Sequence, residues 1–342
     1  MKNNPFLPWG MPDKLMGRKE EQKLISGFVN DISNGRSRIM VIQGAPGTGK
    51  TTLMKIAEGE SKGAKLFTAL IKAGKKERET GVVRALKAEL EDEVSARSQT
   101  GEIVFVKARQ FTQDNAGTFN QLLGLVTRVT GNGNLILIID DFDEIQKPKD
   151  VLRGIAKSIE RRPGVGFVVS STKRLPAPSE TTVIELGGVD EHDFREYIEK
   201  TTKDTAKMGD ECQNSVYRDS GGNPRMIQLI CWYLFNKAKD TDKIISRAHY
   251  SANLRGILGL LGHEWFSEQY FKASDEEKKI LKRFANMGEA SVTAVAKSIG
   301  KSPGPVATLI LRLEERGDIV KVKRGIYKVF SPLYGKFVLE RS

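Results

Sequence analysis

The sequence predicts an α/β fold: a parallel sheet flanked by helices, followed by a helical segment and a small C-terminal unit of three helices and a hairpin. Up to residue 188, short apolar runs of strand length alternate with segments of helical spacing, a pattern typical of βαβ units and a parallel sheet. Beyond Gly188 the spacing is helical only. The last 71 residues read as three helices and a hairpin, and they are markedly basic.

The strands and helices of the predicted sheet follow one another in regular order. The first strand, RIMVIQ, ends in a glycine-rich turn and leads into a helix, as a buried parallel strand does. The stretch 64–100 is interpreted as a mostly helical insertion, although KLFTALI within it has the composition of a short strand. The expected strands are 38–43, 102–108, 135–140, 165–171 and 181–186, and the expected helices are 51–60, 118–130 and 151–161.

Three domains are expected. Residues 1–188 form the sheet domain. Residues 189–271 form a helical lid, in which Asp190 caps one helix and another begins near Pro224 after a Gly-Gly-Asn breaker. Residues 272–342 form the winged helix, with helices 275–287, 292–299 and 303–316 and two short strands around Arg324-Gly325.

Composition excludes several classes of function. The chain has 342 residues and a formal net charge of +12, and no apolar run approaches the ~20 residues that span a bilayer. Two cysteines and three histidines are too few for a disulfide framework or a zinc cluster. We expect a soluble cytoplasmic protein without a membrane partner. The basic excess suggests nucleic acid or another acidic partner, or merely solubilising charge.

A phosphate-binding loop follows the first strand. GAPGTGKT fits the pattern G-x-x-x-x-G-K-[ST] between a predicted strand and a predicted helix, which indicates ATP or ADP binding. Its glycines let backbone N–H groups face the phosphates, and the helix N-terminus adds partial positive charge. Lys50 supplies a cation for the phosphate oxygens. The residues expected to bind nucleotide here are Gly44, Ala45, Pro46, Gly47, Thr48, Gly49, Lys50, Thr51 and Thr52.

A second apolar strand, in LILIIDDFDEI, ends in two aspartates. We expect Asp140 to hold Mg²⁺ together with the Thr51 hydroxyl, and Asp141 to act as general base toward the attacking water. The alternative is an acidic turn after a buried strand.

These motifs resemble those of AAA+/STAND-type P-loop ATPases, and within them the archaeal-type predicted ATPases and the origin-recognition-complex branch. Gly17-Arg18-Lys19-Glu20-Glu21 resembles the family's N-terminal box, which implies that Arg18 lies near the adenine. Ser170-Ser171-Thr172 stands where the family places sensor 1; we name Ser171 as the candidate, and the choice among the three residues stays open. Gly221-Gly222-Asn223-Pro224-Arg225 resembles the sensor 2 region, which implies that Arg225 reaches the γ-phosphate.

The resemblance also implies an arginine finger and raises one departure. Arg174 is the best candidate for the finger, followed by Arg161 and Arg162, although an ordinary surface charge is the more common role for such an arginine. Asp140-Asp141 replaces the usual Asp-Glu pair, which favours slow hydrolysis and a switch rather than a motor.

The C-terminal 71 residues resemble a winged helix. They carry 15 Lys and Arg against 8 Asp and Glu, a net charge of +7. Helix 303–316 would enter the major groove of DNA and the hairpin would contact phosphates. The residues expected to contact DNA are Lys301, Arg312, Lys321, Lys323, Arg324 and Lys328. The alternative is a protein-contact module, because the helix uses much of its surface for packing and ends in two glutamates.

Three functions remain open at this stage. The first is an ATP- and Mg²⁺-dependent switch that controls homo-oligomerisation and binding of double-stranded DNA, as in replication initiation, helicase loading or mobile-element maintenance. The second is a STAND-type signalling or defence switch with a protein partner. The third is a nucleotide-binding scaffold with little turnover.

Overall fold

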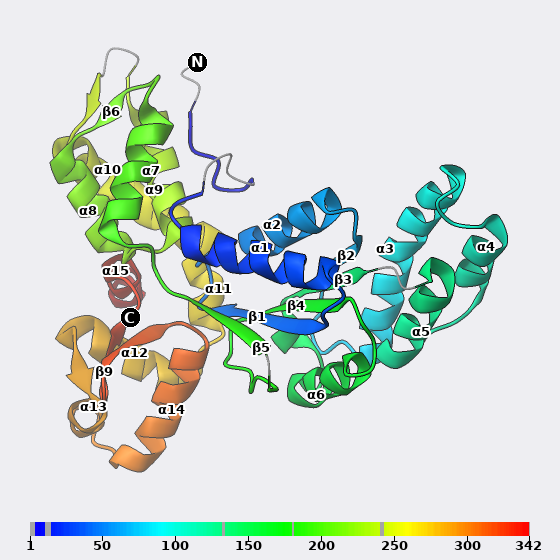
Figure 1. Cartoon of the computed structure of the whole chain (residues 1–342). Helices are drawn as coiled ribbons and strands as arrows, with labels where there is room; N and C mark the ends of the chain where they lie inside the picture. The colour runs from blue at the N-terminus through cyan, green and yellow to red at the C-terminus, as the bar shows by residue number, and fades with distance from the viewer. Residues whose placement is uncertain (1–3, 11–14, 132–133, 180, 240–242, 342) are drawn as a thin grey trace. The chain divides into compact units, whose positions relative to one another are not determined.

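The protein is described from a computed structural model, in which residues 4–10, 15–131, 134–179, 181–239 and 243–341 are described. The chain divides into two compact units. The sheet unit comprises Lys19–Gly44 and Gly49–Leu186. The helical unit comprises Met1–Arg18, Ala45–Thr48 and Gly187–Ser342. Figure 1 shows their helices and strands.

The sheet unit contains five parallel strands in the order β2-β3-β4-β1-β5. The pairing places Lys72 of β2 level with Asp140 of β3. It places Gln43 of β1 level with Ser171 of β4. The carboxyl ends of these strands therefore meet at one edge, and the predicted parallel α/β sheet is confirmed. The strands are β1 (Arg38–Gly44), β2 (Phe67–Lys72), β3 (Leu135–Asp140), β4 (Val165–Ser171) and β5 (Thr181–Leu186).

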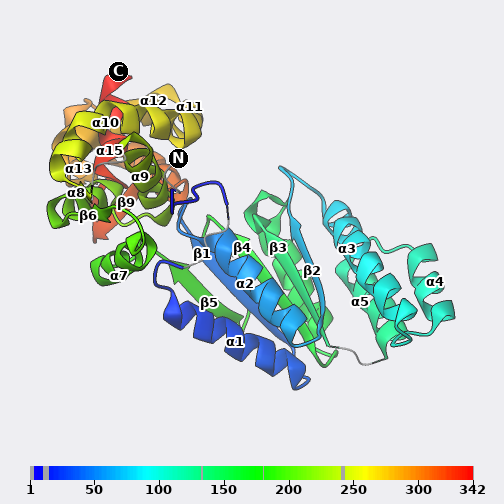
Figure 2. The same cartoon turned by 90° about the horizontal axis from the view of Figure 1, so that it is seen from above.

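Helices cover both faces of the sheet because side chains of each strand alternate between the faces. Met40 and Ile42 of β1 pack with α1 and α2 on one face, where Figure 2 shows the two helices lying along the strands. Ile39 and Val41 face the opposite core, which α3, α5 and α6 complete. The helices are α1 (Lys19–Ser33), α2 (Lys50–Gly63), α3 (Glu79–Gln99), α4 (Phe105–Gln113), α5 (Phe119–Thr130) and α6 (Pro148–Ile159).

The expected strand 102–108 is wrong. Val104 is the N-cap of α4, and the apolar side chains of Val104, Phe105 and Val106 are exposed rather than buried by a sheet. The strand beside β3 is instead β2, which lies inside the stretch interpreted as an insertion. That stretch is therefore helical only in α3, and its first part belongs to the central sheet.

The first part of the helical unit is a helical bundle with two very short strands. Helix α9 begins at Pro224, as expected, and the side-chain oxygen of Asn223 caps it by accepting the N–H groups of Arg225 and Met226. The elements are α7 (Glu191–Thr202), β6 (Lys207–Met208), α8 (Asp210–Ser220), α9 (Pro224–Lys237), β7 (Ile244–Ile245), α10 (Arg247–Leu261), the π-helical turn η2 (Gly262–Phe266) and α11 (Ser267–Phe271).

The C-terminal part of this unit has the three helices and the hairpin expected from the sequence. Strand β8 adds to the hairpin and makes a three-stranded antiparallel sheet in the order β8-β10-β9. The elements are α12 (Asp275–Met287), β8 (Ala290–Ser291), α13 (Val292–Ser298), α14 (Pro303–Glu315), β9 (Ile319–Lys323), β10 (Ile326–Val329) and α15 (Pro332–Glu340).

The segments predicted as lid and winged helix share one hydrophobic core. The ring centroid of Phe266 lies 5.2 Å from that of Tyr334 and 5.5 Å from that of Phe337, and Trp265 lies 5.4 Å from Phe330. Residues before and after position 272 are thus packed together within the helical unit. Within the described part of the chain, no helix has the length and apolar character needed to cross a membrane.

Candidate functional site

The glycine-rich loop Gly44–Thr51 joins β1 to α2. Gly47 and Gly49 have φ angles of 78° and 100°, which L-residues with a side chain rarely adopt. Gly49 is the N-cap of α2, so Lys50, Thr51 and Thr52 form the first turn of that helix. The loop thus places backbone N–H groups and a helix N-terminus together, an arrangement suited to an anionic ligand.

The tip of this loop, residues 45–48, is bound by other parts of the helical unit. The side-chain amide of Asn223 donates to the Pro46 carbonyl at 3.0 Å. The backbone N–H of Arg225 donates to the Gly47 carbonyl at 3.2 Å. The guanidinium of Arg18 donates to the Thr48 carbonyl at 3.2 Å. Three successive carbonyl oxygens of the tip are therefore occupied.

In the sheet unit, Lys50 and Thr51 lie beside the carboxyl end of β3. The Lys50 ammonium is buried and donates to the Gly44 carbonyl at 2.7 Å. Burial lowers its pKa, and the negative charges of Asp141, Asp143 and Asp140 oppose that shift. An anionic ligand at Lys50 would act in the same direction as these carboxylates and favour the charged amine.

Asp140 is buried and bonded on both oxygens. Its Oδ2 accepts from the Thr51 hydroxyl at 2.8 Å, and its Oδ1 accepts from the Ser170 hydroxyl. The structure thus joins the two residues predicted to hold Mg²⁺. A carboxylate and a hydroxyl are ligand types that Mg²⁺ takes alongside waters and phosphate oxygens. No cluster of three or more His, Cys, Asp or Glu suited to a metal ion exists among the described residues.

Asp141 follows β3 in a left-handed conformation with φ 53° and ψ 41°. Its N–H donates to the Ser170 hydroxyl oxygen at 2.9 Å and to Oδ1 of Asp140 at 3.1 Å. The sharp turn directs the Asp141 side chain away from the line of the strand. Its carboxylate then meets the ammonium of Lys72, with 3.1 Å between Nζ and Oδ2.

Lys72 is a residue of the site that the sequence interpretation missed. It ends β2 and stands level with Asp140 across the sheet. The hydrogen bond to Asp141 raises the pKa of Lys72, so the amine stays charged. Recognition of β2 as the neighbour of β3 would have indicated it, since parallel strands end at the same edge.

The three polar residues at the end of β4 have different partners. Ser170 binds Asp140, as described, while the hydroxyl of Ser171 donates to the Lys173 carbonyl at 2.6 Å. Thr172 donates its N–H and its hydroxyl to Asp143. Among the three, Ser170 is the one that the structure brings to the aspartate pair, and Ser171, our sequence choice, points to its own turn.

Of the predicted arginines, Arg174 is 83% exposed and forms an ion pair with Glu185 at 3.2 Å. Arg18 has a φ of 69°, and besides Thr48 it donates to the Gly187 carbonyl. The Arg225 guanidinium donates to the Glu264 carbonyl at 3.2 Å and lies 5.3 Å from the centre of the Trp265 ring. The backbone of Arg225 thus contacts the loop tip, while its side chain contacts η2.

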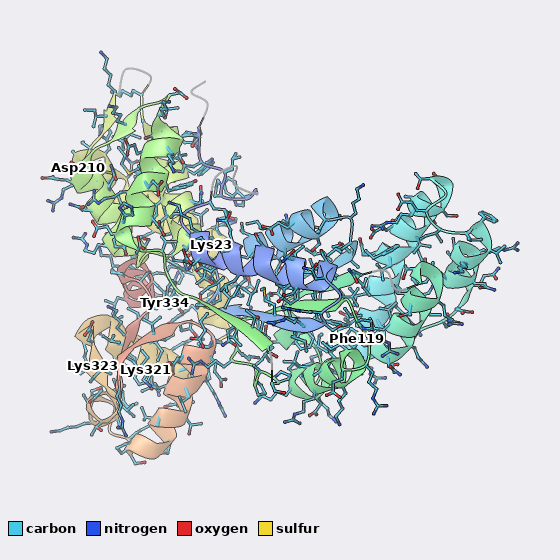
Figure 3. All side chains as sticks on the ribbon, viewed as in Figure 1. Lys23, Phe119, Asp210, Lys321, Lys323 and Tyr334 are labelled. Carbon is cyan, nitrogen blue, oxygen red and sulfur yellow. The ribbon has the colours of Figure 1, made fainter. Side chains whose placement is uncertain are left out.

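The predicted nucleic-acid contacts lie in the C-terminal part of the helical unit. Lys301 pairs with Glu276, and hydrogen bonds from Lys279 and from Lys301 lower the pKa of that carboxyl to about 2. Lys328 pairs with Glu289 at 3.3 Å. Figure 3 labels Lys321 and Lys323 on β9. Among the residues with described positions, no ion-pair partner is found for Arg312, Lys321, Lys323 or Arg324, all of which are exposed.

Comparison with known proteins agrees with the loop and the sheet. Residues 14–169 match the AAA ATPase domain family. A Walker-type ATPase of Pyrococcus abyssi has a similar structure, with a TM-score of 0.71 at 13% identity over 95% of this chain and 96% of that chain. No curated protein sequence matches significantly.

Two further solved structures are similar over nearly the whole chain. The Cdc6 protein of Pyrobaculum aerophilum gives a TM-score of 0.52 at 13% identity, over 100% of this chain and 99% of that one. The ORC2 protein of Aeropyrum pernix, solved as ADPNP-ADP complexes, gives 0.55 at 14% identity, over 99% and 98%. At such identities the likeness concerns the fold. It agrees with the match of residues 14–169 to the AAA ATPase domain family, and the protein is an ATPase with the P-loop fold.

Proposed function

We propose that this ATPase is a nucleotide-controlled switch whose C-terminal segment, residues 272–342, is a winged helix that binds double-stranded DNA. ATP binding would favour a homo-oligomer, and hydrolysis would release it. The observation that carries the proposal is the group of four exposed cations without an ion-pair partner among the described residues, Arg312, Lys321, Lys323 and Arg324.

Within the ATPase site we assign roles by contact. Lys50 neutralises phosphate charge, Thr51 and Asp140 hold Mg²⁺, and Asp141 accepts the proton of the attacking water. Mg²⁺, when bound with ATP, would neutralise part of the phosphate charge. Ser170, and not Ser171, orients the aspartate pair through its hydroxyl. Arg225 as sensor 2 and Arg174 as finger would each have to exchange their present partners for phosphate.

The geometry of the hairpin supports contact with phosphates rather than reading of bases. Lys321 and Lys323 are two residues apart on β9, so they project from the same face of the strand. Arg324 occupies the adjoining turn. Lysine ammonium groups on a flexible stem neutralise phosphates without regard to sequence. Helix α14 offers only Arg312 as an exposed basic side chain, which is little for recognition of base edges.

The test is the salt dependence of duplex binding. Each phosphate contact contributes about 0.9 to the slope of log K against log salt, so a Lys321/Lys323/Arg324→Ala variant should lower the slope by about 2.7. Lys75/Lys149/Lys157→Ala removes the same charge from exposed positions of the sheet unit and serves as the control. If the intact protein with ATP binds no duplex at low salt, or if both variants behave alike, the DNA role is wrong.

A STAND-type switch with a protein partner is the second candidate. It is favoured by exposed apolar side chains among the same cations: Leu311 of α14 is 52% exposed and Val322 of β9 is 40% exposed. The ion pairs of Lys301 and Lys328 also reduce the charge offered to DNA. Light scattering with ATP, with and without duplex, separates the two candidates, because only the first expects the duplex to join the nucleotide-dependent oligomer.

A further inference from the structure

The turn between α14 and β9 touches the tip of the phosphate-binding loop. Gly317 in this turn has a φ of 76°, and it lies directly against Ala45 and Pro46. A Cβ atom at Gly317 would stand 2.8 Å from Cδ of Pro46 and 3.2 Å from Cβ of Ala45. The contact therefore has room for a glycine and for no larger residue.

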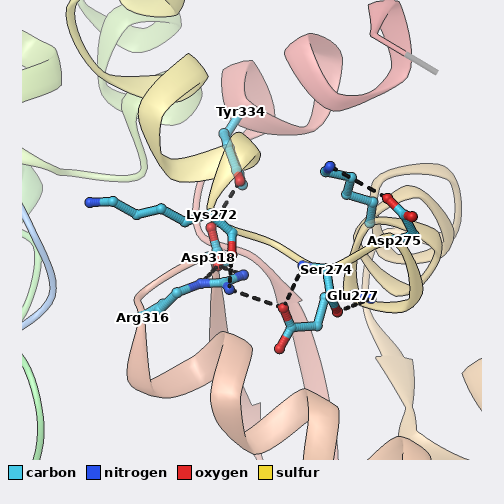
Figure 4. Close-up of polar contacts among 8 residues, drawn as sticks. Lys272, Ser274, Asp275, Glu277, Arg316, Asp318 and Tyr334 are labelled. Carbon is cyan, nitrogen blue, oxygen red and sulfur yellow. Dashed lines mark hydrogen bonds and ion pairs between the residues drawn. The ribbon is translucent and has the colours of Figure 1, made fainter.

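Polar contacts on both sides of Gly317 hold the turn in place. The buried Asp318 carboxylate accepts from Nε of Arg316 at 2.6 Å and from the Tyr334 hydroxyl at 2.8 Å. Arg316 also donates to Glu277 at 3.0 Å (Figure 4). Removal of one partner would leave a buried charge unpaired, which is costly. The turn cannot move alone, because α12, α14 and α15 are tied to it.

The opposite side of the loop tip is held by the start of α9. Asn223 donates to the Pro46 carbonyl while its own oxygen caps α9, and the Arg225 N–H donates to the Gly47 carbonyl. A Cβ at Gly47 would lie 2.7 Å from Oδ1 of Asn223, so this contact is also close. The tip thus lies between the Gly317 turn and the start of α9, and both determine where its peptide groups point.

The Gly317 turn is continuous with the basic hairpin. Strand β9 begins at Ile319, and Lys321 and Lys323 follow on the same strand. The Phe330 N–H, just after β10, donates to the Asp318 carbonyl at 3.2 Å. A ligand that displaces the hairpin must therefore displace Gly317, and a nucleotide that reshapes the loop tip must press on the same residue.

We propose that Gly317 is a positioning residue of the nucleotide site, and that the turn Arg316–Asp318 couples the loop tip to the basic hairpin. The part concerning nucleotide rests on the ATPase assignment alone. The part concerning the hairpin's ligand rests on the proposed DNA binding.

Gly317→Ala tests the first part, with Gly325→Ala as its matched control. Both glycines have nearly the same φ, 76° and 74°, so both substitutions carry the same backbone strain. A Cβ at Gly325 meets no atom within 4 Å, whereas one at Gly317 meets the loop tip. We expect titration with fluorescent mant-ATP to give at least tenfold weaker binding for Gly317→Ala and a change below twofold for Gly325→Ala. Equal affinity of the two variants would overturn the proposal.

A double variant separates the contact from a general loss of structure. In a Pro46→Ala background the Cδ atom that meets the new methyl group is gone, so Gly317→Ala should weaken mant-ATP binding less than it does in the wild-type background. The same loss in both backgrounds would contradict a direct contact. Hydrogen exchange of the wild-type protein needs no variant: ATPγS should increase amide protection in 313–323 and leave α13 unchanged. No change in 313–323 would contradict the coupling.

The second part is tested by reciprocity. If the turn couples the two sites, ATPγS changes duplex affinity, and duplex changes ATPγS affinity, measured by competition with mant-ATP, by the same factor. We expect the wild-type protein and Gly325→Ala to show this change in affinity. In Gly317→Ala, each ligand should leave the affinity for the other unchanged. Duplex binding that ATPγS leaves unaltered would refute the coupling. A protein that binds no duplex at all would refute the DNA role, while the mant-ATP result would still decide the role of Gly317.

Discussion

Asp141→Asn should abolish most hydrolysis while leaving the protein folded. Asp141 has a φ of 53°, and Asn is one of the few residues with a side chain that accept this conformation as readily as Asp. The backbone N–H bonds to Ser170 and Asp140 are retained. The loss is the ion pair with Lys72, whose side chain is 73% exposed, and such pairs contribute about 0–1 kcal/mol.

The effect on catalysis should be far larger. An amide cannot accept the proton of the attacking water, and loss of a general base typically costs about 10²–10⁴ in rate. That range corresponds to a barrier higher by about 3–5 kcal/mol. Nucleotide affinity should be unchanged or slightly tighter, because a carboxylate that repels phosphate is removed while Lys50 and the loop remain.

The assay is single-turnover hydrolysis at saturating ATP, with mant-ATP titration in parallel. Asp150→Asn is the control: Asp150 of α6 forms an exposed ion pair with Arg153, also at 3.1 Å, and its removal changes the net charge equally. A hydrolysis rate of Asp141→Asn within threefold of the control would refute the assignment of the base. A loss of mant-ATP binding would instead place Asp141 in ligand binding.

Three further outcomes are expected. Lys72→Met should raise kcat by up to about fivefold, because it removes an exposed ion pair of at most about 1 kcal/mol from the general base, whereas Lys75→Met should not change kcat in the same assay. Lys50→Ala should weaken mant-ATP binding by about 10- to 100-fold, through loss of charge-assisted hydrogen bonds; unchanged binding would remove the loop assignment. Burial raises the pKa of Cys212 to about 12 and that of Cys231 well above its usual value, so neither thiol of the native protein should react with a disulfide reagent at pH 8.5. Since the unfolded thiols ionise near pH ~8.5, the melting temperature should fall as pH rises above that value.

The site motifs were predictable because they are local. Gly44–Thr51 and the aspartates after β3 each form a short segment in which residue types, spacing and flanking elements agree. The positive φ angles at Gly47 and Gly49 could be expected because glycine adopts them without strain. The start of α9 could also be predicted, because Asn followed by Pro is a strong signal for the beginning of a helix.

The error at residues 102–108 has a physical origin. The segment EIVFVKA alternates well enough to suit a strand, and a short apolar run does not distinguish a strand from a helix. Sheet position is decided by which run is buried beside β3, and that run is β2. The same error concealed Lys72, because its relation to Asp141 exists only once β2 and β3 are neighbours.

The choice among Ser170, Ser171 and Thr172 depends on the register of β4 against β3, which the sequence alone does not reveal. Ile139 of β3 is level with Val169 of β4, so Ser170 follows at the level of Asp140. Side chains alternate along β4, which turns the next residue to the other face. A register of one residue therefore decides which hydroxyl reaches the aspartate pair.

Gly317 and Gly325 show where sequence reasoning stops and packing begins. Both follow a basic residue, both have a φ near 75°, and each would be assigned to a turn for the same reason. Yet one lies in open space and the other against Pro46, more than 270 positions earlier in the chain. The conformation of a phosphate-binding loop is usually attributed to its own glycines. Here the carbonyls of Pro46 and Gly47 are bound to Asn223 and Arg225, and the Gly317 turn lies against the same tip. The geometry that the loop presents to phosphate is therefore a property of the helical unit as much as of the motif.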